Sequence, residues 1–148
     1  MKEERKVIEH NAIVAFSEGI NAKKINELSK DFHGDIVING NLLVDEDLKV
    51  ECNLHIIGDI KCEHKKSIDI EGDLYCWGVI DCYNISVSGD FCCHTSIDCS
   101  DIIVGGDFWC HDSIDTNFSK IIVAGDFWSR KVDTLDMYVL GKMQVEIK

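Results

Sequence analysis

One short motif recurs seven times between residues 36 and 141 of this chain. It consists of two apolar residues at alternate positions, one further residue and a glycine, which is usually followed by aspartate. The glycines are separated by 18, 14, 17, 17, 19 and 16 residues. Repetition with a period of this length is typical of folds in which successive turns of the chain stack on one another. The seven copies are Ile36-x-Ile38-x-Gly40, Leu54-x-Ile56-x-Gly58, Ile68-x-Ile70-x-Gly72, Ile85-x-Val87-x-Gly89, Ile102-x-Val104-x-Gly106, Ile121-x-Val123-x-Gly125 and Met137-x-Val139-x-Gly141.

Each repeat contains further short pieces of the same alternating kind. A second piece follows the glycine, as in Phe91-x-Cys93, and a third follows in most repeats, as in Ile97-Asp98-Cys99. Such strands have one inward face, and no two-residue hairpin turns separate them. We therefore expect an all-β fold, a single-stranded parallel β-helix (β-solenoid) with about 17 residues and three short strands per rung. Glycine would serve each corner through a positive φ angle or a close backbone approach, and the following Asp would hydrogen-bond the backbone there.

The repeats divide the chain into two regions. Residues 34–148 are expected to form about six to seven rungs of solenoid, whereas residues 1–33 lack the motif. Asn21–Lys30 carries apolar residues among Lys and Glu, which predicts a short amphipathic helix that caps the first rung. At the other end, the alternation continues through Met143 and Val145 with no helix after them. This rung is expected to leave an open strand edge for a homodimer or homopolymer contact, unless nearby charges blunt it.

Composition limits the classes of partner. With 15 Lys and Arg against 27 Asp and Glu, the 148 residues carry a formal charge of -12, yet 45% of them are apolar. The chain should therefore fold, and its charge argues against direct binding of nucleic acid or of a membrane surface. A basic protein is the expected partner. No apolar stretch has the length of a signal peptide or a spanning helix, so we expect a cytoplasmic protein whose eight cysteines are reduced thiols or metal ligands.

Aspartates fall into two columns when the rungs are stacked. The segment 67–119 contains ten acidic residues and no Lys or Arg. Two carboxylates per rung of ~4.8 Å give one charge per ~2.4 Å, comparable with the ~1.7 Å of duplex DNA. We hypothesise that this flank imitates a nucleic-acid backbone in the basic groove of a protein, although Asp at a corner also has local structural uses. The phosphate surrogates would be Asp73, Asp90, Asp107, Asp81, Asp98 and Asp115.

Aromatic side chains are expected on the face between these columns. In strands of the Phe-x-Cys kind, Phe and Cys point inward, so the residues between and after them point outward. Large aromatic residues supply binding hot spots, so we expect a partner to be anchored by Tyr75, Trp77, Trp109 and Trp128. The same face could instead be the protein's own dimer interface or lie beneath the N-terminal segment. The two outward columns are expected to read Lys61, Tyr75, Cys92, Trp109, Trp128 and Glu63, Trp77, His94, His111, Arg130.

The architecture resembles two known classes of protein. The tandem short strands and glycine corners over residues 34–148 resemble bacterial β-solenoid cytoskeletal proteins of the bactofilin type, which implies a self-assembling scaffold. The acidic coil resembles the pentapeptide-repeat class of DNA mimics, which implies inhibition of a nucleic-acid-binding protein, although the five-residue repeat is absent. Hexapeptide acyltransferases match less well, because the apolar steps Phe91, Ile97, Ile102, Phe108 are 6, 5 and 6 residues long.

Cysteine and histidine offer one weaker site. Cys92, His94 and His111 are expected to point outward on adjacent rungs, and nitrogen and sulfur ligands suit zinc. Motifs for nucleotide hydrolysis, serine hydrolysis and zinc proteolysis are absent, and the Cys92–His94 pair lacks an identifiable oxyanion hole, so we expect neither catalysis nor a cofactor. The inward cysteines would pack the core, with Cys62, Cys76, Cys93 and Cys110 in one column and Cys82 and Cys99 in another.

Taken together, these patterns favour a non-enzymatic binding protein. Its acidic, aromatic face would bind and inhibit a basic, nucleic-acid-binding protein by charge mimicry. A self-assembling scaffold that uses the C-terminal rung is the alternative, and a zinc-binding protein is the third hypothesis.

Overall fold

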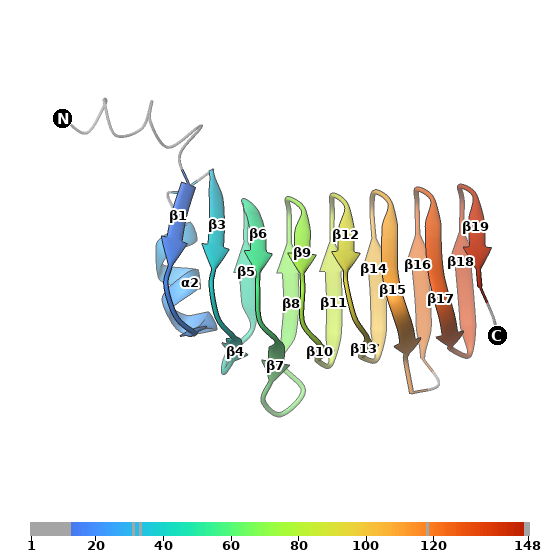
Figure 1. Ribbon diagram of the computed structural model, residues 1–148, viewed down its shortest axis with the longest axis horizontal. Helices are drawn as coiled ribbons and strands as arrows, with labels where there is room; N and C mark the ends of the chain where they lie inside the picture. Colours follow the sequence, from blue (N-terminus) through green and yellow to red (C-terminus); the bar gives the residue numbers. More distant parts are fainter. Residues whose placement is uncertain (1–12, 31, 33, 118, 147–148) are drawn as a thin grey trace.

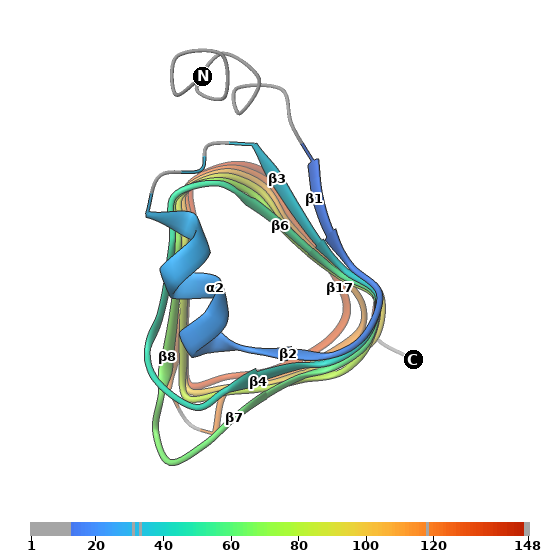
Figure 2. The same cartoon turned by 90° about the vertical axis from the view of Figure 1, so that its left-hand side faces the viewer.

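The computed structural model describes residues 13–30, 32, 34–117 and 119–146. Within them the chain winds into a β-solenoid of about 7 turns, with about 18 residues per turn and 54% of the residues in strands. The turns stack along one axis (Figure 1), and each has three sides, so that the cross-section is a triangle (Figure 2). The fold predicted from the repeat is therefore confirmed. Residues 1–12 of the expected N-terminal region lie outside the described residues.

The sides of the triangle form three faces, and every strand pair is parallel. Face 1 consists of β1 (Ile13–Phe16), β3 (Asp35–Ile38), β6 (Asn53–Ile56), β9 (Leu74–Cys76), β12 (Phe91–Cys93), the first parts of β15 (Phe108–Asp115) and β17 (Phe127–Asp133), and β19 (Met143–Val145). Face 2 consists of β2 (Ile20–Asn21), β4 (Leu42–Val44), β7 (Ile60–Cys62), β10 (Ile80–Asp81), β13 (Ile97–Asp98) and the second parts of β15 and β17. Face 3 consists of β5 (Leu48–Val50), β8 (Ser67–Ile70), β11 (Asn84–Val87), β14 (Asp101–Val104), β16 (Lys120–Val123) and β18 (Asp136–Val139).

The glycines of the sequence motif lie at two different corners of the triangle, which the strand pairing distinguishes and the motif does not. The motif aligns Leu54 with Ile68, but the structure pairs Leu54 with Leu74 on face 1 and places Ile68 on face 3. Both faces end in an apolar-x-apolar piece before a turn, so the motif does not distinguish them. Gly40, Gly58 and Gly78 lie at the corner between faces 1 and 2, whereas Gly72, Gly89, Gly106, Gly125 and Gly141 lie at the corner between faces 3 and 1.

Close backbone packing, and not a positive φ angle, explains the corner glycines. None of the described glycines has a positive φ. At Gly106 the backbone amide donates to the carbonyl oxygen of Gly89 at 2.9 Å, and an added Cβ would lie 2.8 Å from that oxygen. A side chain at this corner would therefore push neighbouring turns apart.

Stacked columns of inward side chains fill the interior. On face 1, the ring centroids of Phe91 and Phe108 are 4.7 Å apart, and those of Phe108 and Phe127 are 5.3 Å apart. The next inward position holds small residues, which leave room for these rings. Each turn thus buries its apolar side chains against the turns on either side, so the two terminal turns each need a cover. The small residues are Cys76, Cys93, Cys110 and Ser129.

A helix supplies that cover at the N-terminal end, as predicted for residues 21–30. In α2 (Ala22–Ser29), Ala22 and Ile25 are fully buried, and the helix lies across the open end of the triangle (Figure 2). The side chain of Asn26 donates to the carbonyl oxygen of Asp47 at 2.8 Å and accepts from the amide of Lys49 at 2.9 Å. These bonds hold the helix to the edge of face 3. Within the described residues, no helix is both long enough and apolar enough to cross a membrane.

Aspartates after the glycines of the face 3 to face 1 corner join one turn to the next. The amide of Asp90 donates to Oδ1 of Asp73 at 2.7 Å, and the amide of Asp107 donates to Oδ1 of Asp90 at 2.8 Å. Asn53 begins this ladder with the same kind of bond to Asp73, and Asp126 ends it by accepting from the amide of Lys142. The Asp side chain therefore bonds to the backbone of the neighbouring turn, in addition to marking a corner.

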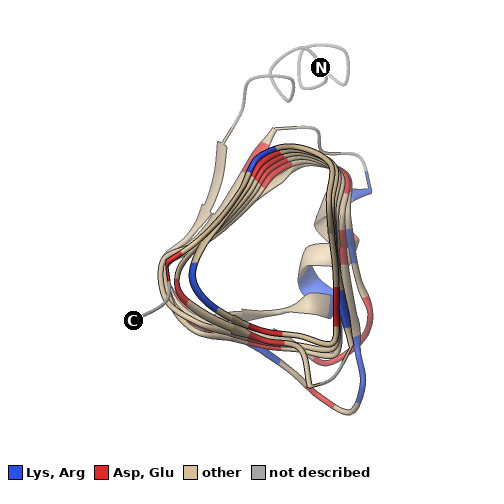
Figure 3. Cartoon of the chain, turned by 90° about the vertical axis from the view of Figure 1, so that its right-hand side faces the viewer, with Lys and Arg blue, Asp and Glu red and all other residues tan. Residues whose placement is uncertain are grey.

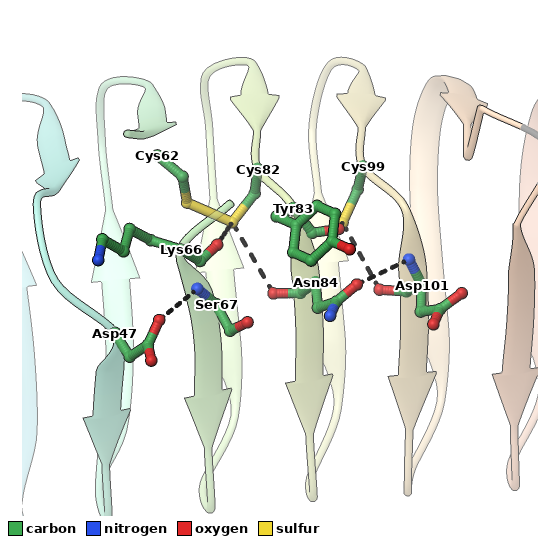
Figure 4. The surroundings of a disulfide bond; sticks show 9 residues. All are labelled: Asp47, Cys62, Lys66, Ser67, Cys82, Tyr83, Asn84, Cys99 and Asp101. Carbon is green, nitrogen blue, oxygen red and sulfur yellow. Dashed lines mark hydrogen bonds between the residues drawn. A yellow bond between two sulfur atoms is a disulfide. The ribbon is translucent and has the colours of Figure 1, made fainter. Parts of the chain in front are cut away.

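A disulfide joins two turns of face 2. Cys62 and Cys82, which the sequence predicts to be reduced, are bonded to each other with their Cα atoms 4.8 Å apart (Figure 4). Cys62 lies on β7 and not in the column of Cys76, because β7 belongs to face 2. Cys62 ends β7 and Cys82 directly follows β10, so the two residues take equivalent positions on adjacent turns, and strand spacing brings their Cα atoms within the range that a disulfide spans. The other six cysteines are free thiols.

Substitution of Asp90 tests the ladder. Asp90→Ala removes the acceptor for the Asp107 amide, and we expect the free energy of unfolding to fall by about 1–3 kcal/mol. Asp90→Asn retains Oδ1, as Asn53 does in the same ladder, and should cost less than half as much. Urea unfolding followed by circular dichroism measures both values. Equal losses for the two variants would show that the ladder bond contributes nothing.

Reduction tests the disulfide. The bond closes a sequence separation of 20 residues, and its loss is expected to lower the free energy of unfolding by about 3 kcal/mol. Addition of a reducing agent should lower the melting temperature of the wild-type protein to that of a Cys62→Ala/Cys82→Ala variant, which should itself be insensitive to the reducing agent. A wild-type melting temperature that is the same with and without the reducing agent would argue against the bond.

Candidate functional site

Strand register defines one outward column along face 1. On β9, Leu74 and Cys76 fill the core, so Tyr75 between them points outward. The in-register column reads His55, Tyr75, Cys92, Trp109, Trp128 and Gln144. The sequence prediction was wrong for Lys61, which pairs with Leu43 and Asp81 on face 2. His55, which the prediction missed, takes the position beside Tyr75.

A second outward column follows at the ends of these strands. The amide of His94 donates to the carbonyl oxygen of Cys76, which places His94 one turn beyond Trp77. His111 and Arg130 hold the corresponding position on the next two turns. Glu63 was predicted in this column, but its amide donates to Val44 on face 2.

The rings of Trp77, His94, Trp109 and Trp128 form one series of contacts across the two columns, and Tyr75 stacks on His55 at 4.8 Å. The ring centroids of Trp77 and His94 are 3.9 Å apart with nearly parallel planes, and His94 meets the edge of Trp109 at 5.2 Å. Trp109 stacks on Trp128 at 5.3 Å. Trp77 is 53% exposed, whereas the others are half-buried because each ring covers its neighbour. We call this surface the aromatic strip; it consists of Tyr75, Trp77, His94, Trp109, His111 and Trp128.

Two columns of aspartates flank the aromatic strip. The corner column precedes the strands of face 1, and the face 2 column lies on the next side of the triangle, where register aligns its members directly. Viewed along the axis, acidic positions of successive turns overlie one another at the top corner and along the lower side (Figure 3). The corner column is Asp73, Asp90, Asp107 and Asp126, and the face 2 column is Asp81, Asp98, Asp115 and Asp133.

The two columns differ in how their carboxylates are engaged. In the corner column, Oδ1 accepts a backbone hydrogen bond from the next turn, which leaves the second oxygen for a partner, except that Oδ2 of Asp73 accepts from the hydroxyl of Tyr75 at 3.5 Å. In the face 2 column, the side chains are exposed, and Asn117 bonds to both Asp98 and Asp115 through its side chain and amide. Burial and the carboxylates of Asp73 and Asp90 raise the pKa of Tyr75, so its hydroxyl stays protonated near neutral pH.

The strip is shallow. A depression of about 380 Å³ lies at its C-terminal end, between the rings of Trp109 and Trp128 and the side chains of Asp107 and Asp126. Arg130, two residues after Trp128, approaches Asp112 at 4.0 Å. Such a surface suits contact with another macromolecule better than enclosure of a small molecule.

The zinc candidates do not converge. Sγ of Cys92 lies 3.8 Å from Nε2 of His94, but the ring of Trp109 contacts both His94 and His111 at centroid distances of 5.2 and 5.6 Å. Among the residues that the structure describes, no group of three or more His, Cys, Asp or Glu side chains could hold a metal ion. Cys92 and His94 are therefore neighbours in a stack of rings, and nothing in their surroundings adds a third ligand.

Burial makes Cys92 a poor nucleophile. It raises the pKa of the Cys92 thiol to about 11, and the neighbouring Cys93 adds to the shift. Burial likewise raises the pKa of Cys76 to about 12. Because the thiolate is the reactive form, a raised pKa leaves little reactive sulfur at Cys92 near neutral pH.

The chain matches no protein-family model, no curated protein and no solved structure.

Alkylation of Cys92 tests whether the thiol is activated. Cys92 is half-buried, whereas the other five free thiols are buried, so iodoacetamide should modify Cys92 first. The rate should rise about tenfold per pH unit as the pH approaches about 11, because the thiolate forms above the pKa. Mass spectrometry measures the rate, and Cys92→Ser is the control. Fast labelling that does not change with pH near neutrality would indicate a thiolate paired with His94 and would support catalysis.

Proposed function

We propose that this molecule is a non-enzymatic, cytoplasmic binding protein whose aromatic strip and acidic columns bind a basic, nucleic-acid-binding protein in place of its nucleic acid. The observation that carries the proposal is the position of a series of contacting aromatic rings, one of them 53% exposed and the others half-buried, between two columns of carboxylates. The six free thiols fit a reducing compartment, and the disulfide is the one feature that does not.

The aromatic strip supplies the anchoring contacts. Trp and Tyr carry a disproportionate share of binding energy at protein interfaces, because they bury a large area for little loss of conformational entropy. Here their rings are already held by one another, so little further freedom is lost when a partner covers them.

The acidic columns supply more charge than the fold needs. In the ladder between turns, Asn53 accepts the same backbone bond as Asp73 and Asp90 without a charge, and Asn41 does so at the other corner. In the face 2 column, Asp98 and Asp115 accept bonds from Asn117, and the described bonds include none to the side chains of Asp81 and Asp133. One charge per ~2.4 Å along the axis, with no Lys or Arg in residues 67–119, favours a partner that normally tracks a phosphate backbone. If the acidic columns occupied the partner's nucleic-acid-binding groove, nucleic acid would be excluded, so binding would also inhibit the partner.

Paired charge reversals test the proposal. Asp81→Lys/Asp98→Lys changes the face 2 column, and Asp69→Lys/Glu71→Lys changes the net charge equally on the face 3 side. Each protein serves as bait for a lysate, and the captured basic protein is then purified and titrated. We expect the first pair to weaken binding at least about tenfold and the second to leave it unchanged. Trp109→Ala should cost at least about 2 kcal/mol of binding free energy.

Competition with DNA completes the test. Wild-type protein should displace a fluorescent duplex from the purified partner, and the Asp81→Lys/Asp98→Lys variant should not. Circular dichroism checks that the variants keep the fold. Equal binding by the two charge-reversal pairs, or capture of no basic protein, would refute charge mimicry.

A further inference from the structure

The two ends of the solenoid are built differently. At the N-terminal end, α2 covers the core with fully buried Ala22 and Ile25. At the C-terminal end, the described residues include no such cover. Met137 and Val139 are only half-buried, whereas Ile121 and Val123 at the same positions one turn earlier are fully buried. The last turn therefore leaves part of the apolar core open.

Exposed apolar side chains also concentrate on this last turn. Leu140 is 83% exposed and Leu135 is 68% exposed. Together with Tyr138 and Met143, they make up four of the five most exposed large apolar side chains in the described chain. A patch of this kind is typical of an interaction surface.

Among the described strands, those of the last turn have a partner on one side only. β18 pairs there with β16, and β19 pairs with β17. The amides of Leu140 and Glu146 donate inward to Val123 and Ser129 at 3.0 and 2.9 Å. Backbone groups alternate along a strand, so the amides of Val139 and Val145 face the open edge, where another strand could accept them.

Charge favours contact at this end over contact along the acidic sides of the solenoid. Residues 127–146 carry three basic side chains and three acidic ones, so their formal net charge is zero, whereas residues 67–119 carry ten acids and no base. Two copies would repel each other along their sides but not end to end. The charged residues of the last turn are Arg130, Lys131, Asp133, Asp136, Lys142 and Glu146.

We infer that the C-terminal turn is a self-association surface on which a second copy of this chain binds tail to tail. A head-to-tail contact would set α2 against the open strands, and the backbone groups in the middle of a helix are already paired. Two C-terminal ends instead offer each other strand edges, apolar side chains and balanced charge. A contact that uses the same surface on both copies closes at a dimer and does not extend into a filament.

The inference does not depend on the proposed function. The aromatic strip lies on face 1, along the side of the solenoid, whereas β18 and β19 lie at its C-terminal end (Figure 1). The Asp81→Lys/Asp98→Lys variant should therefore dimerise like the wild type even though it loses its basic partner.

Sedimentation velocity over a wide range of protein concentration tests the inference on the full chain. We expect the mass to rise with concentration from 16.7 kDa to twice that value and to stop there. Leu140→Asp, which places a charge in the apolar contact, and Val145→Pro, which removes an edge amide, should each raise the dimer dissociation constant at least about tenfold. Ile57→Asp is the matched control, because it makes the same change at a 46% exposed residue far from this end, and it should dimerise normally.

Hydrogen exchange provides a readout that requires no variant. The amides of Val139 and Val145 should become protected as the concentration rises, whereas exposed amides of the N-terminal turns should not change. A mass that stays at one chain at every concentration, or one that continues to grow beyond two, would overturn the tail-to-tail dimer. Dimerisation of Leu140→Asp and Val145→Pro at wild-type strength would overturn it as well.

Discussion

Parallel, in-register pairing between successive turns is the constraint on which the rest of this structure depends. Because each turn repeats the path of the one before it, a residue type that recurs in the sequence becomes a column in space. Inward columns must be apolar and close-packed, as the rings of Phe91 and Phe108 are. Outward columns need be neither apolar nor close-packed, so charged and aromatic side chains can line up along the axis of the solenoid. The acidic columns and the aromatic strip both follow from this register.

The repeat period and residue alternation are enough to predict the solenoid, its three-sided turns and the capping helix. The register of the early turns could not be predicted, because faces 1 and 3 both present two inward apolar residues before a turn. One sequence signal of this register is the 14-residue step between Gly58 and Gly72, because Gly58 lies at the corner between faces 1 and 2 and Gly72 lies at the corner between faces 3 and 1. The turn after β7 then holds His64 and Lys65 at positive φ, and this local extension lengthens the separation of Cys62 and Cys82 to 20 residues.

These irregularities in the repeat length decided which site residues were predicted in the right column. Tyr75, Trp109 and Trp128 were predicted in one column and lie in one, because the turns from β9 onward keep a regular period. Lys61 was misplaced and His55 was missed, because both precede the irregular turn. The stacking of His94 between Trp77 and Trp109 depends on side-chain rotamers, which alternation alone does not determine.

A solenoid can in principle add turns indefinitely, because every turn offers the same strand edges to the next one. Within the described residues, the two ends of the stack differ: a helix bonded to the backbone lies at one end, and a neutral, apolar turn lies at the other. Long runs of like charge in the middle would resist lateral contact between copies, so association is directed to the ends. If the open turn is covered by its counterpart on a second chain, the pair gains a closed core and a rod of twice the length. Both acidic sides then remain free for a partner.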